Sequence, residues 1–240
     1  MSIARDITTV GAATLASRLL GFLRDTGVAG LLGAGALSDA YFAALQIPNL
    51  FRRLLAEGAL NSAYVPMSMR IRDENGAVAA RQFSEEVLGA MMAALVALAL
   101  LCVLFAPAIV HLLAPGFRSE GERFPLAAEF VRLSIAYVGA AGAVAVAASA
   151  LNAEGRVVAA AFGLIVFNAV LVTVVGTLIL SGAAATQATA AVLSAAMAVA
   201  GLMQLVCVGT AWLRLDVRPR RTESLRHREV RWTQPLQNRV

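Results

Sequence analysis

Charged side chains occur inside an apolar stretch at residues 38–66, SDAYFAALQIPNLFRRLLAEGALNSAYVP. Charges within a membrane-spanning helix are costly, roughly 2.5–3.5 kcal/mol each on insertion scales, and they usually face a cavity or mark a pathway. On a continuous helix, one face of this stretch about 40° wide collects polar side chains. Its members are Asp39, Gln46, Arg53 and Glu57. The spacing therefore predicts a polar stripe along an otherwise apolar helix.

An anion site is predicted in the middle of the same stretch. Pro48 has no backbone N–H to donate, so we expect the helix to restart at Asn49, which can cap it. A helix start has free amides and a partial positive charge and favours a carboxylate, yet Arg52 and Arg53 follow here. A phosphate group would satisfy both the amides and the guanidinium groups. The alternative is that both arginines extend to the cytoplasmic membrane surface.

A second charged motif, SRLLGFLRD at residues 17–25, lies in the preceding apolar segment at 8–32. At about 1.5 Å per residue, that segment is long enough to cross ~30 Å of hydrocarbon. Arg18 would then lie near mid-membrane, too deep to reach the surface easily. We expect Arg18 or Arg24 to pair with Asp25 or Asp39, which still leaves positive charge over.

Composition excludes an ordinary soluble domain, because 59% of residues are hydrophobic and the mean hydropathy is +0.74. Residues 1–213 are neutral, with 12 Arg against 12 acids, and residues 214–240 hold 8 Arg against 3 acids. The basic pI therefore reflects a tail and does not indicate a nucleic-acid-binding body. Cys102 and Cys207 are far apart and the His residues are isolated, so neither a disulfide nor a metal site is expected. The sequence has no nucleophile–base pair or phosphate loop, so we expect neither an enzyme nor a cofactor.

The apolar segments predict an all-α polytopic membrane protein with about six spanning helices. They cover residues 8–32, 37–69, 83–113, 126–151, 157–180 and 188–213. The second would measure roughly 50 Å, longer than the membrane is thick, so it must bend or tilt, and Pro48 and Pro66 offer the places. Arginines gather in the 70–82 loop, the 152–156 turn and the tail, so the positive-inside rule predicts that both termini are cytoplasmic.

Three motifs resemble the MurJ (MviN) family. They are SRLLGFLRD at 17–25, GAG with SDAYFAALQIPNLFRRLLAEGALNSAYVP at 33–66, and APGF at 114–117. The resemblance covers about residues 5–213 and implies the multidrug/oligosaccharidyl-lipid/polysaccharide exporter fold. It also implies a lipid II flippase of the bacterial cytoplasmic (inner) membrane, which moves undecaprenyl-pyrophosphate-linked peptidoglycan precursor by alternating access.

The family lines a central cationic cavity with basic residues of its first two helices. The motif match carries this role to Arg18, Arg24, Arg52 and Arg53, with Asp39 and Glu57 as acidic partners. The expected substrate-binding residues are these together with Asp25 and Asn49. The expected partners are lipid II, membrane lipids and a second lobe. No nucleic-acid partner is expected.

The sequence also departs from the family pattern. Residues 1–213 provide one six-helix lobe where the family has two lobes and two further helices. The tail at 214–240 does not resemble the family's route into a seventh helix, so we expect a truncated or frameshifted end, or a cytoplasmic tail that touches anionic lipid. The alternative functions are another polysaccharide-lipid flippase of this fold, or a non-transporting membrane fragment or assembly subunit.

Overall fold

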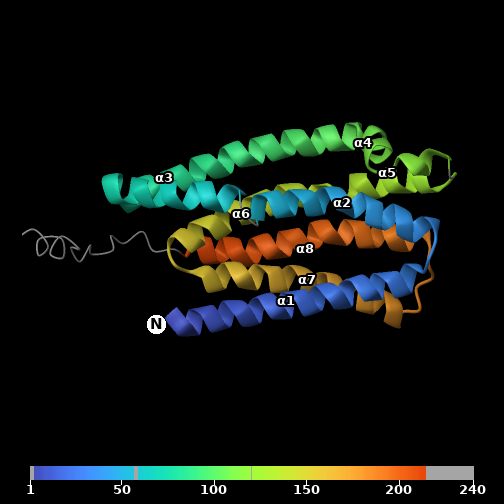
Figure 1. Ribbon diagram of the computed structural model, residues 1–240, viewed down its shortest axis with the longest axis horizontal. Coiled ribbons are helices and arrows are strands. Elements are labelled where there is room, and N and C mark those ends of the chain that lie inside the picture. The colour runs from blue at the N-terminus through green and yellow to red at the C-terminus, as the bar shows by residue number, and fades with distance from the viewer. Residues whose placement is uncertain (1–2, 57–58, 120, 215–240) are drawn as a thin grey trace, which may run out of the picture.

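The chain is a bundle of helices that run along one common axis (Figure 1). The computed structural model describes residues 3–56, 59–119 and 121–214, and no strand occurs among them. Most of the basic tail expected at 214–240 therefore lies outside the described residues. The helices are α1 Ile3–Leu32, α2 Ala36–Ala56, α3 Ala59–Leu104, α4 Ala106–Leu113, the short 3₁₀ helix η1 Pro115–Ser119, α5 Arg123–Ser134, α6 Ala136–Ala153, α7 Val157–Leu180 and α8 Gln187–Leu213.

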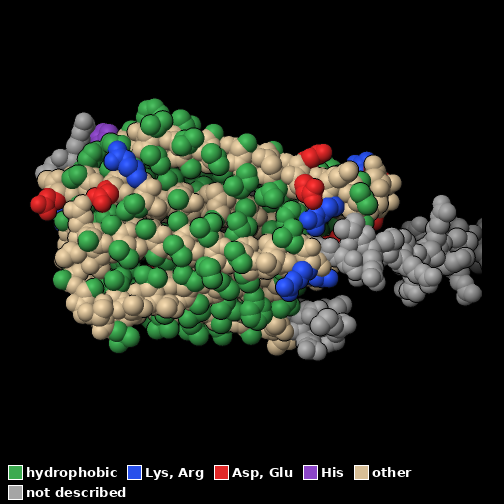
Figure 2. Space-filling model, turned by 180° about the vertical axis from the view of Figure 1, so that it is seen from behind, with side chains coloured by type: hydrophobic (Ala, Val, Ile, Leu, Met, Phe, Trp, Pro, Cys, Tyr) green, Lys and Arg blue, Asp and Glu red, His purple; other side chains and the backbone are tan. Residues whose placement is uncertain are grey.

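Within the described residues, four segments are long and apolar enough to span a membrane. They are Leu60–Leu104, Arg123–Ala153, Val157–Leu180 and Gln187–Leu213. Helices α1 and α2 are long but carry several charges in apolar sequence, which is the feature that singles them out as a candidate site. Figure 2 shows that apolar side chains cover the middle of one face, whereas charged side chains lie toward its two ends. The all-α multi-pass architecture predicted from the sequence is confirmed.

Pro48 does not interrupt the helix of the long second segment. Helix α2 is continuous from Ala36 to Ala56 and includes Pro48, and Pro66 likewise lies inside α3. Helices α2 and α3 are separate elements, and residues 57–58 between them are outside the described part. Helix α3 then reverses direction at Gly76, whose φ of 90° and ψ of 174° favour glycine, so its two limbs form a hairpin (Figure 1).

Proline does break the third expected segment, between α3 and α4. Pro107 lies in the first turn of α4 and cannot donate to the carbonyl of Val103, four residues earlier. The Nε of Arg132 on α5 donates to that carbonyl at 3.4 Å. The side chain thus partly satisfies the acceptor that the proline leaves free, and it joins α5 to the end of α3.

Helix α6 lies at the centre of the bundle. Most of its side chains are buried, and it packs against α2, α3, α7 and α8. Its small residues allow this close approach: a Cβ added to Gly142 would lie 1.9 Å from Cδ1 of Leu95 on α3. Helix α1, by contrast, packs mainly on α7 and leaves Leu15, Leu19 and Phe22 exposed. The outer face of α1 is therefore available to lipid or to another protein segment.

Candidate substrate-binding site

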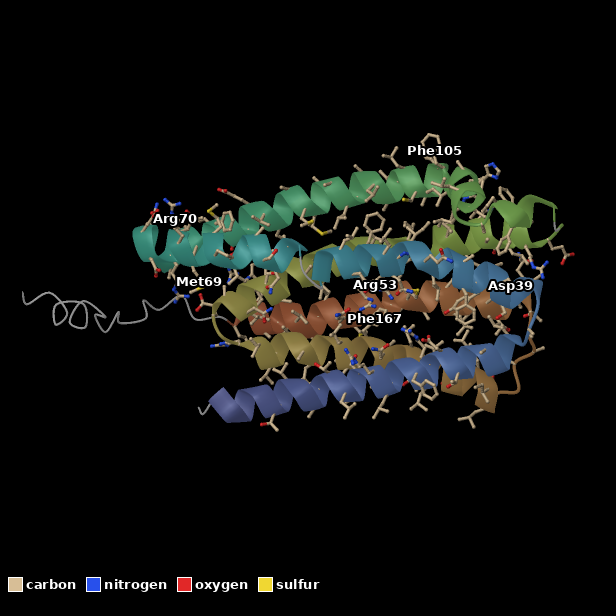
Figure 3. The ribbon with its side chains drawn as sticks, in the orientation of Figure 1. Asp39, Arg53, Met69, Arg70, Phe105 and Phe167 are labelled. Atoms are coloured by element: carbon tan, nitrogen blue, oxygen red, sulfur yellow. The ribbon has the colours of Figure 1, made fainter. Side chains whose placement is uncertain are left out.

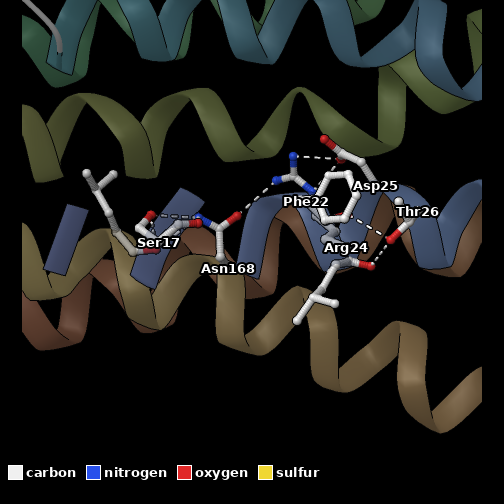
Figure 4. Close-up of polar contacts among 8 residues, drawn as sticks. Ser17, Phe22, Arg24, Asp25, Thr26 and Asn168 are labelled. Atoms are coloured by element: carbon white, nitrogen blue, oxygen red, sulfur yellow. Dashed lines mark hydrogen bonds and ion pairs between the residues drawn. The ribbon is translucent and has the colours of Figure 1, made fainter. Parts of the chain in front are cut away.

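Arg24 is held between its neighbour on α1 and a side chain of α7 (Figure 4). It forms an ion pair with Asp25 at 2.8 Å, and its Nη1 donates to Oδ1 of Asn168 at 3.1 Å. The Arg24 side chain is 20% exposed and that of Asp25 is 56% exposed. Arg24 therefore retains part of its surface while two acceptors fix its position, and the expected pairing of Arg24 with Asp25 is confirmed.

Asn168 joins α7 to two positions of α1 that are about two turns apart. Its amide nitrogen donates to the Oγ of Ser17 at 3.0 Å, to the Ser17 carbonyl at 3.3 Å and to the Leu164 carbonyl at 3.2 Å. Its oxygen accepts from Arg24, so both ends of the amide are used. Ser17 and Arg24 are seven residues apart, about two helical turns, so both can reach one asparagine.

Sequence reasoning gave Asn168 no place in the site. An isolated Asn in an apolar helix indicates an interhelical hydrogen bond, and that much is observed. Its link to Arg24 depends on how α1 and α7 are placed side by side, which the sequence does not reveal.

Arg18 is exposed on α1. Among the residues that the structure describes, it makes no ion pair with Asp25 or Asp39. A cation near the middle of an apolar helix is costly when it faces lipid, so its position favours a water-filled or anion-occupied space beside it.

Arg52 on α2 and Arg24 on α1 belong to two separate charged motifs. Both guanidinium groups act electrostatically on the hydroxyl of Tyr137, a buried residue of α6. The Tyr137 ring in turn packs on Phe167 of α7, with ring centroids 5.0 Å apart. The hydroxyl of Tyr137 thus lies within electrostatic range of arginines from two separate motifs.

The predicted helix start at Asn49 is wrong. Because α2 continues through Pro48, the amides of residues 50–53 lie within a helix and do not form an open anion cradle. Arg52 and Arg53 also point in different directions, since adjacent residues on a helix are about 100° apart. Arg53, Asn49 and Gln46 border a separate hollow of about 380 Å³, which Leu113 of α4 closes on its other side.

Asp39 pairs with a residue of α5. It is in the first turn of α2 and accepts a hydrogen bond and ion pair from the Nε of Arg123 on α5 at 3.0 Å. Figure 3 shows Asp39 at the end of the lobe where α2 begins, whereas Arg53 lies near mid-lobe. Thirteen residues separate Asp39 from Arg52, about 20 Å along the helix. Among the described ion pairs, the expected pairing of Asp39 with Arg18 or Arg24 is not observed. Glu57 lies outside the described residues.

Comparison with known proteins identifies the family. The family model described as lipid II flippase MurJ matches residues 28–233. The chain belongs to the MurJ family. The match extends into the tail, beyond residue 213, where we expected the resemblance to end.

Curated MurJ relatives align with part of this chain. A probable lipid II flippase MurJ from Rhizobium tropici is 41% identical over 139 residues, which are 58% of this chain and 26% of the relative. One from Rhizobium meliloti is 41% identical over 152 residues, which are 63% of this chain and 28% of the relative. The lipid II flippase MurJ of Burkholderia cenocepacia is 35% identical over 138 residues, which are 58% of this chain and 27% of the relative. The matched region thus spans about a quarter of these relatives.

A solved MurJ structure has the same fold. The lipid II flippase MurJ in an inward closed conformation superposes with a TM-score of 0.69 at 22% identity. The match covers 84% of this chain and 41% of that protein. At this identity the likeness establishes the arrangement of the helices in the MurJ lobe, and the roles of individual residues rest on the geometry above.

Proposed function

We propose that this chain forms one lobe of a lipid II flippase and that this lobe supplies one cationic wall of the substrate cavity. The observation that carries the proposal is the placement of Arg24 in an apolar helix, where Asp25 and Asn168 hold its guanidinium group while its side chain stays 20% exposed. Arg52 on α2 supplies a second cation. Arg18 adds a third cation on α1. Family membership supports the substrate, because the relatives are named as lipid II flippases.

A lipid-linked pyrophosphate matches this wall chemically. Its charged head cannot cross hydrocarbon unaided, since unpaired polar groups there cost several kcal/mol or more. The planar guanidinium fork binds phosphate oxygens through two parallel hydrogen bonds and stays charged. The polyprenyl chain would remain in lipid while the pyrophosphate is shielded between two lobes. Rocking of this lobe against a second one would then expose the head first to one side of the membrane and afterwards to the other.

The proposed contacts to the pyrophosphate come from Arg18, Arg24 and Arg52. Asp25 and Asn168 position Arg24 and leave part of its guanidinium group accessible. Asp39 has a structural partner in Arg123, and Asn49 and Arg53 border the separate hollow, so we assign these three residues to conformational roles. The membrane is proposed to be the bacterial inner membrane, with both termini in the cytoplasm.

A chimeric transporter tests this function. Residues 1–213 would replace the corresponding lobe of a full-length relative in a bacterium depleted of its own lipid II flippase. We expect growth to be restored, and we expect Arg24→Ala in the same chimera to abolish it. The control is Arg70→Ala, because Arg70 is 71% exposed and pairs only with its own helix at Glu74 among the described contacts. Full growth with Arg24→Ala, at normal membrane levels, would refute the proposed role.

A further inference from the structure

An apolar groove runs along the outside of the lobe between α3 and α8, away from the arginine wall. Its volume is about 340 Å³, and α6 forms its floor. The residues that shape it are Leu88 on α3, Ala143 and Ala147 on α6, and Leu205, Gly209 and Trp212 on α8. Small side chains on the floor and a glycine in the wall keep this space open.

The lining of the groove fits a hydrocarbon chain. From Leu205 to Leu213 the groove follows α8 for about 12 Å, and the surface that lines it is almost wholly apolar. A hydrocarbon chain has no hydrogen-bonding group that such a lining would leave unsatisfied.

Trp212 closes one end of the groove, and the guanidinium group of Arg81 lies over its ring. Its side chain is 8% exposed, and Cζ of Arg81 on α3 lies 4.4 Å from the ring centroid. The Nε of Arg81 also donates to Glu85 at 2.9 Å. Arg81, Glu85 and Leu88 are four and three residues apart, so one face of α3 leads from a charged end into the groove.

Beyond Trp212 the surroundings become polar. A small pocket on the other side of the ring contains the ion pair of Arg72 with Glu154 and the hydroxyl pair of Tyr64 with Ser84. Trp212 lines both the groove and this pocket. An apolar channel that ends at a tryptophan and then at arginine has the order of chemical groups met on passing from a bilayer core to its headgroups.

We propose that this groove binds one acyl chain of a phospholipid from the cytoplasmic leaflet, with the lipid phosphate held by Arg81. The ring of Trp212 packs against the chain near the glycerol region and fixes the guanidinium group above it. Glu85 uses only one edge of that group, so other N–H donors remain for a phosphate oxygen. The site lies on a different face from Arg18, Arg24 and Arg52 and does not rest on the proposed flippase activity.

Tryptophan quenching by brominated lipid tests the groove. The sequence has two Trp residues, and Trp232→Phe leaves Trp212 as the sole fluorophore. The full chain would be reconstituted with phosphatidylglycerol or phosphatidylethanolamine brominated along the acyl chain, and in parallel with brominated diacylglycerol, which lacks phosphate. Gly209→Leu fills the groove, whereas Gly89→Leu adds the same side chain at a position with no atom within 4 Å of its Cβ.

We expect Gly209→Leu to weaken retention of the brominated phospholipid during detergent exchange by about threefold or more, because the chain loses its van der Waals contacts. Gly89→Leu should retain it as the parent does. Arg81→Gln should weaken retention by about two- to fivefold, the size of one exposed charge contact, and should not affect diacylglycerol.

Three results would overturn the proposal. Equal quenching and retention in the Gly209→Leu and Gly89→Leu variants would show that no chain occupies the groove. Loss of chain–chain cross-linking in Gly209→Leu, without any loss of lipid, would show that a second copy covers this face instead. If the affinity for the brominated lipid does not depend on its phosphate and does not change in Arg81→Gln, Arg81 does not hold the headgroup.

Discussion

Asn168 on α7 accepts a hydrogen bond from Arg24 on α1 at 3.1 Å, and the two residues are 144 positions apart in the chain. The same amide donates to Ser17, two turns earlier on α1. One uncharged side chain on the candidate membrane span α7 thus sets the position of a cation on α1. Because Asp25 supplies the only other described acceptor, Arg24 keeps donors available for a ligand.

Asn168→Ala should impair both helix packing and transport. We expect it to lower the free energy of unfolding by about 1–2 kcal/mol, since interhelical hydrogen bonds in membranes average ~0.6 kcal/mol and this side chain makes several. Growth complementation by the chimera should fall more than its membrane level does. The matched control is Thr173→Ala on the same helix, because Thr173 bonds only to the Ala169 carbonyl among the described contacts. Equal complementation by the two variants would contradict a role for Asn168 in placing Arg24.

Arg18 and Arg52 should each tolerate alanine poorly in the same growth assay. Lysine at either position should give intermediate growth, because the charge remains while the two-pronged phosphate geometry is lost. The measurement is growth at matched protein levels in the membrane. Normal growth of both alanine variants would favour the alternative in which these arginines only reach toward the membrane surface.

The pair formed by Asp39 and Arg123 should be structural and weak. The two side chains are 50% and 28% exposed, so a double-mutant cycle with Asp39→Asn and Arg123→Gln should give a coupling of about 0.2–1 kcal/mol. If Asp39 acts through this pair, adding Arg123→Asp to a chimera that carries Asp39→Arg should restore its growth. Failure of the exchanged pair, with Arg123→Gln alone harmless, would indicate that Asp39 has another partner.

The orientation of the lobe can be tested with single cysteines. In a chain carrying Cys102→Ser and Cys207→Ser, we expect Ser119→Cys to react with an impermeant thiol reagent added outside intact cells. Asn75→Cys, beside the hairpin turn at Gly76, should react only after the cells are opened. This follows from the excess of arginine around the hairpin and the positive-inside rule. The reverse pattern would place the hairpin outside.

The sequence by itself determined the class of protein and the unusual chemistry of its first two helices. Few folds are possible for apolar segments of membrane length, because every backbone N–H and C=O group in lipid must form a hydrogen bond within the segment. Arg18, Arg24 and Arg52 could be singled out for the same reason, since the cost of a charge in an apolar helix depends on local sequence. The motifs around them were enough to indicate the family.

Only the tertiary structure decided which groups these charges meet. Pro48 lies within a continuous helix, so the capped start at Asn49 does not form, whereas Pro107 breaks its helix and Arg132 binds the carbonyl left free. Asp39 forms an ion pair with Arg123, and Arg24 donates a hydrogen bond to Asn168. These choices depend on distances between helices that are far apart in the chain, and local periodicity carries no information about such distances.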